Sequence, residues 1–161
     1  MLVRPLLLAA SLLLASSSAW AGASHRTAGS TGLGLGAGTT GGGISVKHFL
    51  TDGTAVQGVI GAYGGWDGGG LGLNADYLLE RPAFATTEPV DIAWNVGLGA
   101  GVGLFPKSNV IGVGVSSIAG LEFAFVPIPL DLVLEYRPTI GVLPGVGLDL
   151  VNFTGHLRYF F

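Results

Sequence analysis

The side chains able to do catalytic or metal chemistry are few and widely spaced along this 161-residue chain. Nucleophilic catalysis needs a histidine within hydrogen-bond reach of a nucleophile and an acid, but no serine lies two or four residues from His156. The three histidines lack metal-ligand spacing, and without cysteine there is no thiol nucleophile, thiolate site or disulfide. We therefore predict no enzymatic activity, no cofactor and no metal site. The residues weighed as catalytic groups are His48, His156, Ser45, Ser116 and Thr154.

A different set of polar groups, the charged residues at alternate positions of apolar segments, suggests a buried ion-pair network. Glu135 and Arg158 are expected at similar depth on adjacent strands, with Glu122 on the strand before, so these three and Arg137 should form its core. The first interpretation is structural, in which buried pairs fix strand register; a gated ion or proton path is the alternative. Acids outnumber bases, so some carboxylates are expected to be protonated or to share a cation. The predicted network is Lys47, Asp76, Glu122, Glu135, Arg137, His156 and Arg158.

The elements that carry these residues have the period-two pattern of β-strands. From Val90 to Leu104 every second residue is apolar, and the residues between are Asp91, Ala93, Asn95 and four glycines. At about 3.3 Å per residue, this stretch is long enough to cross a bilayer while tilted. The same alternation predicts a strand ending at residue 161 after a turn at 144–149, and six others at 31–38, 44–50, 54–63, 71–80, 110–125 and 130–143.

Prolines and mixed faces limit this strand assignment. Both faces of 54–63 carry apolar residues, so its register stays open. Pro138 inside 130–143 predicts a bulge or a missing ladder bond. The connection 81–89 begins and ends near Pro82 and Pro89, and we expect proline to keep it out of any ladder.

Eight strands in sequence order, joined by short connections, predict an all-β, eight-stranded antiparallel up-and-down barrel. Hydrophobic residues are 49% of the chain and charged residues 11%, yet no apolar run of helix-spanning length follows residue 21. A closed barrel spreads such hydrophobicity over alternate outward positions, which suits a transmembrane barrel. The interior of eight strands is only wide enough for side chains, so a conducting pore is not expected. Glycines on the inward face either let the strands bend and pack or leave room for a small apolar ligand.

The N-terminus has the features of a cleaved secretory signal. Arg4 gives a positive start, residues 6–15 an apolar core, and Ala19-Trp20-Ala21 a cleavage site. We predict a signal peptide at 1–21 and a barrel domain at 22–161. Loss of Arg4 leaves six basic residues against ten acidic ones, a net charge of −4, which argues against nucleic acid as a partner.

The C-terminal segment Gly155–Phe161 resembles the last strand by which bacterial outer-membrane barrels are recognised for insertion. Its outward aromatic and apolar residues would be the assembly signal, at Leu157, Tyr159 and Phe161. The whole chain resembles the small OmpA-type eight-stranded outer-membrane barrels of Gram-negative bacteria, with the closer likeness at 41–49, 74–78 and 129–138. This resemblance implies the bacterial outer membrane as location, with membrane lipids and the barrel-assembly machinery as partners. It implies no activity, although some barrels of this size are lipid-modifying enzymes that use a histidine with a serine and an acid.

Aromatic residues are expected to form two girdles at the membrane interfaces. We predict a periplasmic girdle of Phe49, Tyr77, Trp94, Phe123, Phe125, Tyr159 and Phe161, and an outer one of Tyr63, Trp66 and Phe105.

The predicted function is a structural or envelope-permeability role as an integral outer-membrane barrel. The alternative is a soluble or membrane barrel that binds a small hydrophobic ligand, as lipocalins do; in the soluble form its apolar set would face inward. A lipid-modifying enzyme is the less favoured third class.

Overall fold

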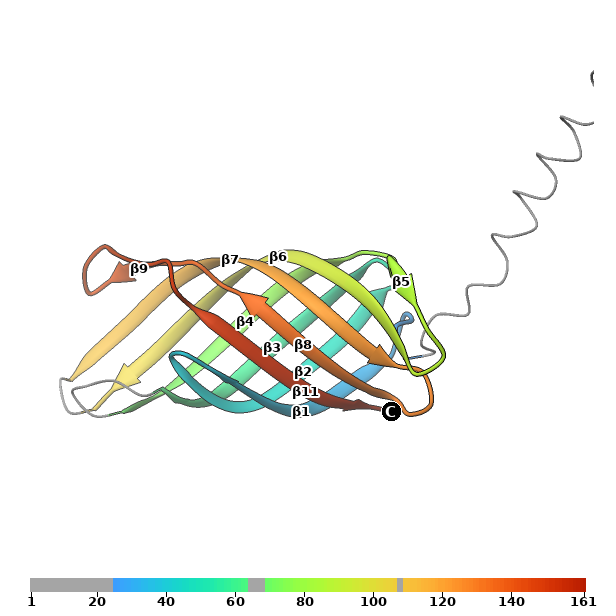
Figure 1. The fold of residues 1–161 in the computed structure, drawn as a ribbon. Coiled ribbons are helices and arrows are strands. Elements are labelled where there is room, and N and C mark those ends of the chain that lie inside the picture. Colours follow the sequence, from blue (N-terminus) through green and yellow to red (C-terminus); the bar gives the residue numbers. More distant parts are fainter. Residues whose placement is uncertain (1–24, 64–68, 107–108) are drawn as a thin grey trace, which may run out of the picture.

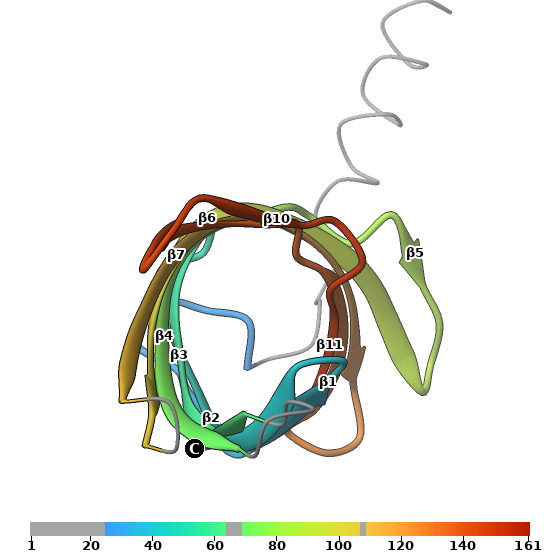
Figure 2. The same ribbon diagram turned by 90° about the vertical axis from the view of Figure 1, so that its left-hand side faces the viewer.

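The computed structural model describes residues 25–63, 69–106 and 109–161, and these form an eight-stranded closed antiparallel barrel (Figures 1 and 2). The predicted signal peptide and Trp66 lie outside the described residues. The wall runs β1–β2–β3–β4–β6–β7–β8–β11, and β11 pairs with β1 to close it. No helix among the described residues is long and apolar enough to cross a membrane.

The long strands match the predicted alternating segments closely, and three short strands lie where the pattern is interrupted. Their bounds are β1 Thr31–Gly38, β2 Gly41–Thr51, β3 Thr54–Tyr63, β4 Gly70–Glu80, β5 Ala85–Thr86, β6 Val90–Phe105, β7 Val110–Phe125, β8 Leu130–Tyr136, β9 Thr139–Leu143, β10 Gly147–Asp149 and β11 Phe153–Phe160.

The ladder fixes the stagger of the barrel. Following paired residues from Trp94 around the wall through Leu121, Leu134 and onward returns to β6 at Leu104, ten residues further along. Ten residues of about 3.3 Å, set against eight strands about 4.7 Å apart, correspond to a strand tilt of about 41°. This tilt lies within the usual range for closed barrels, so the register is geometrically consistent with full closure.

The two ends of the barrel differ. The turn at 52–53, the segment 81–89, the turn at 126–129 and the C-terminus gather at one end, here called the termini end (Figure 1). The turn at 39–40, the adjoining ends of β3, β4, β6 and β7, and the segment 144–152 gather at the other, here called the loop end.

The alternation sorts the side chains into two environments. In β6, Asp91, Ala93 and Asn95 are buried inside the barrel, whereas Trp94 and Leu98 are exposed on the outer face. In β3, whose register stayed open, Ala55, Gln57 and Val59 face inward and Val56 and Ile60 outward. The barrel therefore has an aliphatic exterior and a polar interior.

Proline interrupts the predicted strand 130–143. β8 ends at Tyr136 and β9 begins at Thr139, and the ladder with β7 is broken at Arg137 and Pro138. Proline has no N–H for a ladder bond, but its carbonyl still accepts from Ser117 N at 3.2 Å. β10 lies within the predicted turn 144–149 and pairs with β9 alone, whereas β11, in the last predicted strand, closes the barrel.

The prediction that 81–89 stays outside any ladder is wrong. Ala85 and Thr86 form β5 and pair with Ile92 and Asp91 of β6. Pro82 and Pro89 stand at the ends of this segment, so the residues between them keep the N–H groups that pairing requires.

The two-girdle prediction is wrong for Phe49, Tyr63 and Phe105, which point into the barrel. Phe49 is fully buried and its ring packs 5.9 Å from that of Phe160. The reason is parity, since Phe49 is two residues from inward Lys47. Strand-end position alone therefore did not decide where the rings point. The rings exposed on the outer face near the termini end include Tyr77, Trp94, Tyr159 and Phe161.

Candidate functional site

The interior of the barrel, with charged side chains near the termini end and a cavity near the loop end, is the candidate site. All seven residues of the predicted network are buried inside the barrel, because each occupies an inward position of its strand or of the β8–β9 junction. The structure divides them between two clusters, and their pairings differ from the expected ones.

The first cluster lies toward the termini end and contains two cations and two carboxylates. Lys47 Nζ lies 2.8 Å from Glu80 Oε1 and also pairs with Glu122. Arg26 Nη2 lies 3.0 Å from Glu80 Oε2, and its Nε lies 2.9 Å from Glu122 Oε1. Each carboxylate therefore contacts both cations, so the cluster is neutral when all four groups are ionised.

Arg26 enters this cluster from the segment before β1, which folds back into the mouth of the barrel. Gly29 N donates to Phe49 O at 2.8 Å and Phe49 N donates to Ser30 O at 3.0 Å. The His25 ring packs 4.8 Å from that of Phe160. Viewed along the barrel, the blue N-terminal trace crosses the interior (Figure 2). We call residues His25–Ser30 the N-terminal plug.

The plug residues sit outside the strands, and their acid–base properties follow from burial and charge. Burial opposes the charged form of Arg26, but Glu122 and Glu80 outweigh it and raise its pKa above the usual value. Burial lowers the pKa of His25, and the nearby Asp131 and Glu122 offset this only in part. Sequence reasoning missed Arg26, because it lies in a short polar lead with no strand pattern.

The second cluster contains the remaining residues of the predicted network together with Asp131. Arg158 pairs with Asp131, its ladder neighbour on β8, with Nη2 at 2.9 Å from Oδ2. Glu135 Oε2 lies 3.2 Å from His156 Nε2 and 3.7 Å from Arg137 Nη1. Arg137 also pairs with Asp76.

The expected Glu122/Glu135/Arg158 core is therefore wrong in its pairings. Glu122 belongs to the first cluster, and Arg158 reaches Glu135 only through Gln57. The Gln57 amide donates to Asp76 Oδ2 at 3.1 Å and to Glu135 Oε1 at 3.0 Å, while its carbonyl accepts from Arg158 Nη1. Sequence reasoning missed Gln57 because it is uncharged and lies on the strand of open register.

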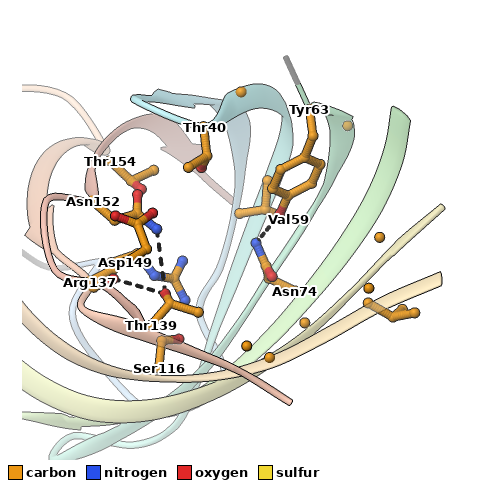
Figure 3. A pocket seen from close by; sticks show the side chains of 18 of the residues that line it. Thr40, Val59, Tyr63, Asn74, Ser116, Arg137, Thr139, Asp149, Asn152 and Thr154 are labelled. Carbon is orange, nitrogen blue, oxygen red and sulfur yellow. Dashed lines mark hydrogen bonds between the residues drawn. The ribbon is translucent and has the colours of Figure 1, made fainter. Parts of the chain in front are cut away.

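The cavity lies on the loop-end side of Arg137 and has a volume of about 270 Å³ (Figure 3). Nine of its lining residues are glycines, at 36, 41, 42, 61, 101, 103, 112, 114 and 141. Its side-chain lining is mostly uncharged, with Thr40, Val59, Tyr63, Asn74, Phe105, Ser116, Arg137, Thr139, Leu143, Asp149, Asn152 and Thr154 contributing. The glycine-rich inward face predicted from the sequence thus borders an open space.

Some of these glycines are also needed for close packing. A Cβ on Gly61 would overlap the carbonyl oxygen of Gly42 on β2, so the two strands approach too closely there for a side chain. A Cβ on Gly72 would overlap the ring of Tyr63, whose hydroxyl accepts from Asn74 Nδ2. Both interpretations of the glycines, close packing and free space, thus apply to the inward face, and both apply at Gly61.

The residues weighed for catalysis are not brought together. His48 Nδ1 is hydrogen-bonded to Thr31 Oγ1 at 2.9 Å, and His156 Nε2 to Glu135. Ser45 is buried, whereas Ser116 and Thr154 line the cavity. Within the described residues, no hydrogen bond joins a histidine to Ser45, Ser116 or Thr154.

In the part of the chain that the structure describes, no three histidine, aspartate or glutamate side chains are arranged to hold a metal ion. The predicted assembly-signal residues Leu157, Tyr159 and Phe161 are exposed on the outer face at and just beyond β11.

No protein-family model, curated protein or solved structure matches this chain.

Proposed function

We propose that the protein is an integral outer-membrane β-barrel with a structural or envelope-permeability role. The observation that carries the proposal is the sorting of side chains across the barrel wall. Leu35, Leu71 and Leu98 on the outer face are 69%, 64% and 72% exposed, whereas Lys47 and Glu122 inside are 0% exposed. Exposure of this large aliphatic surface to water would be unfavourable, whereas lipid acyl chains would cover it.

The same sorting argues against the soluble ligand carrier. A carrier of that kind turns its aliphatic face inward around the ligand and its polar face to water. Here the aliphatic side chains are outside and the ion pairs inside. The signal-like N-terminus and the outward Leu157, Tyr159 and Phe161 favour export and insertion into the outer membrane, with its lipids and the assembly machinery as partners.

The interior favours a barrier over a pore. The two clusters place four basic side chains among carboxylates, with Gln57 bonded to three of the ionisable groups. The N-terminal plug adds a further obstruction at the termini end. We therefore expect residues 22–161 in a planar bilayer to give no steady ion conductance.

Depth-matched spin labels test the membrane assignment. Ala100 is exposed on the outer face and pairs with Val115, while Ser116 pairs with Gly99 one residue away and lines the cavity. Because the chain has no cysteine, Ala100→Cys and Ser116→Cys each give a single labelling site. In vesicles, the label at residue 100 should be relaxed by oxygen dissolved in lipid and the label at residue 116 by a water-soluble nickel chelate. The opposite pattern, or a protein that stays dispersed in buffer without detergent, would contradict the proposal.

A further inference from the structure

The loop-end cavity is a part of the interior that a purely structural role does not explain. Arg137, paired with Asp76, lies at the inner side of the cavity, where the second charged cluster fills the barrel interior. The cavity is not enclosed at its other side. It therefore has the form of a cup with a charged floor.

Hydrogen-bonding groups from several strands converge on this cup. Asn74 of β4, Ser116 of β7, Thr139 of β9 and Thr154 of β11 all line it. Thr139 Oγ1 is already engaged, since it donates to Arg137 O at 3.0 Å. The Ser116 and Thr154 side chains form no hydrogen bond within the described part of the chain, so their hydroxyls are available to a bound molecule.

The charge in the cup does not favour an anion. The Arg137 guanidinium is held by Asp76 and lies 3.7 Å from Glu135, so its positive charge is already compensated. Asp149 adds a carboxylate to the lining. A ligand that suits this site has no net negative charge and bonds through neutral groups.

Two aromatic rings give the cup flat apolar surfaces. Tyr63 and Phe105 both turn inward, although an outward position was expected for each. Tyr63 is fixed by the hydrogen bond from Asn74, and Phe105 packs over the bare backbone of Gly103 and Gly112. Apolar faces beside a few placed polar groups are the usual lining of small-molecule sites.

We infer that this cavity binds a small, neutral, polyhydroxylated molecule of about the size of one sugar ring. Its hydroxyls would bond to Ser116, Thr154 and the neighbouring amides, and its C–H face would lie against Tyr63 or Phe105. The volume of about 270 Å³ is slightly below the range of drug-sized ligand sites, so the space within the cup suits a single ring. This inference does not depend on the membrane assignment, because it concerns only the interior.

Saturation-transfer NMR on residues 22–161 tests the ligand class. The protein is held in micelles of a polyoxyethylene detergent, which has no sugar head group to compete. The probes are glucose, glucuronate as its anionic analogue, and hexanol as an apolar molecule of similar size. We expect transfer to the ring protons of glucose and weaker transfer to glucuronate. Transfer to hexanol alone, or to none of the probes, would overturn the inference.

Variants locate the site. Thr154→Val keeps the shape but removes one hydroxyl and should weaken glucose binding about tenfold, and Ser116→Leu should abolish it by filling the cup. The matched control is Val115→Leu, one residue from Ser116 but on the outer face, which should bind as the parent does. A heat-modifiable gel band confirms that each variant is folded, and unchanged binding in folded Thr154→Val would place the ligand elsewhere and refute the assignment.

Discussion

Arg158 of β11 and Asp131 of β8 stand directly opposite each other in the ladder and are joined by charge-assisted hydrogen bonds inside the barrel. Arg158 Nη2 donates to Asp131 Oδ2 at 2.9 Å, and Nε donates to Oδ1 at 3.1 Å. Both side chains are buried. The pair therefore links the closing strand to its neighbour by side chains as well as by backbone.

Removing Arg158 should destabilise the barrel strongly. Arg158→Met leaves the Asp131 carboxylate buried without its partner, and such a loss typically costs about 3–5 kcal/mol. The temperature at which the fast-migrating band disappears from a heat-modifiability gel should fall. The control is Arg81→Met, at an exposed arginine, where the change should be small. Combining Arg158→Met with Asp131→Leu should recover much of the loss; a double variant no more stable than the single one would contradict the pairing.

Neutralising the N-terminal plug should open a cation leak. Arg26→Gln leaves Glu80 and Glu122 with Lys47 as the one cation of the first cluster, so that cluster becomes net negative. Planar-bilayer recordings should show a small conductance with preference for K⁺ over Cl⁻, which the parent protein lacks. Arg26→Lys keeps the charge and should stay closed. An anion-selective or unchanged current in Arg26→Gln would show that Arg26 does not set this barrier.

Acidification should loosen the N-terminal plug. The pKa of His25 is lowered by burial, so the folded state binds fewer protons than the unfolded state near this residue. The stabilisation is present above the usual histidine pKa of about 6.5 and is lost as the pH falls below it. Hydrogen exchange at the Gly29 amide, corrected for intrinsic rates, should therefore become faster between pH 7 and pH 5. His25→Phe, which keeps a ring against Phe160, should remove this dependence; its persistence would assign the effect to another group.

Two glycines of the inward face should respond differently to the same substitution. At Gly61 a Cβ would overlap Gly42 O, so Gly61→Ala should lower the yield of folded barrel on refolding. At Gly141 the nearest atom to such a Cβ is 3.8 Å away, so Gly141→Ala should refold as the parent does. Equal yields for the two variants would mean that β2 and β3 can separate without cost.

Alternation along the chain was sufficient to predict the eight-stranded barrel and the inward placement of Lys47, Asp76 and Arg158, because parity alone determines the face of a strand. It could not predict which inward groups meet. That choice depends on the stagger of ten residues around the wall, which brings Lys47 of β2 to Glu122 of β7 across the interior. Gln57 and Arg26 were not predicted as members of the network, because Gln57 is neutral and Arg26 lies outside any strand.

The side-chain clusters connect parts of the chain that are far apart in sequence. Arg26 reaches Glu80 and Glu122 across 54 and 96 residues, and Arg158 reaches Gln57 across 101. A partly assembled, open sheet would keep these groups hydrated, and all of them lose water together when the first and last strands meet. Since contacts of such long range form late and slowly, assembly should be all-or-none with a high barrier near its final step, and the same barrier should make the finished barrel slow to unfold.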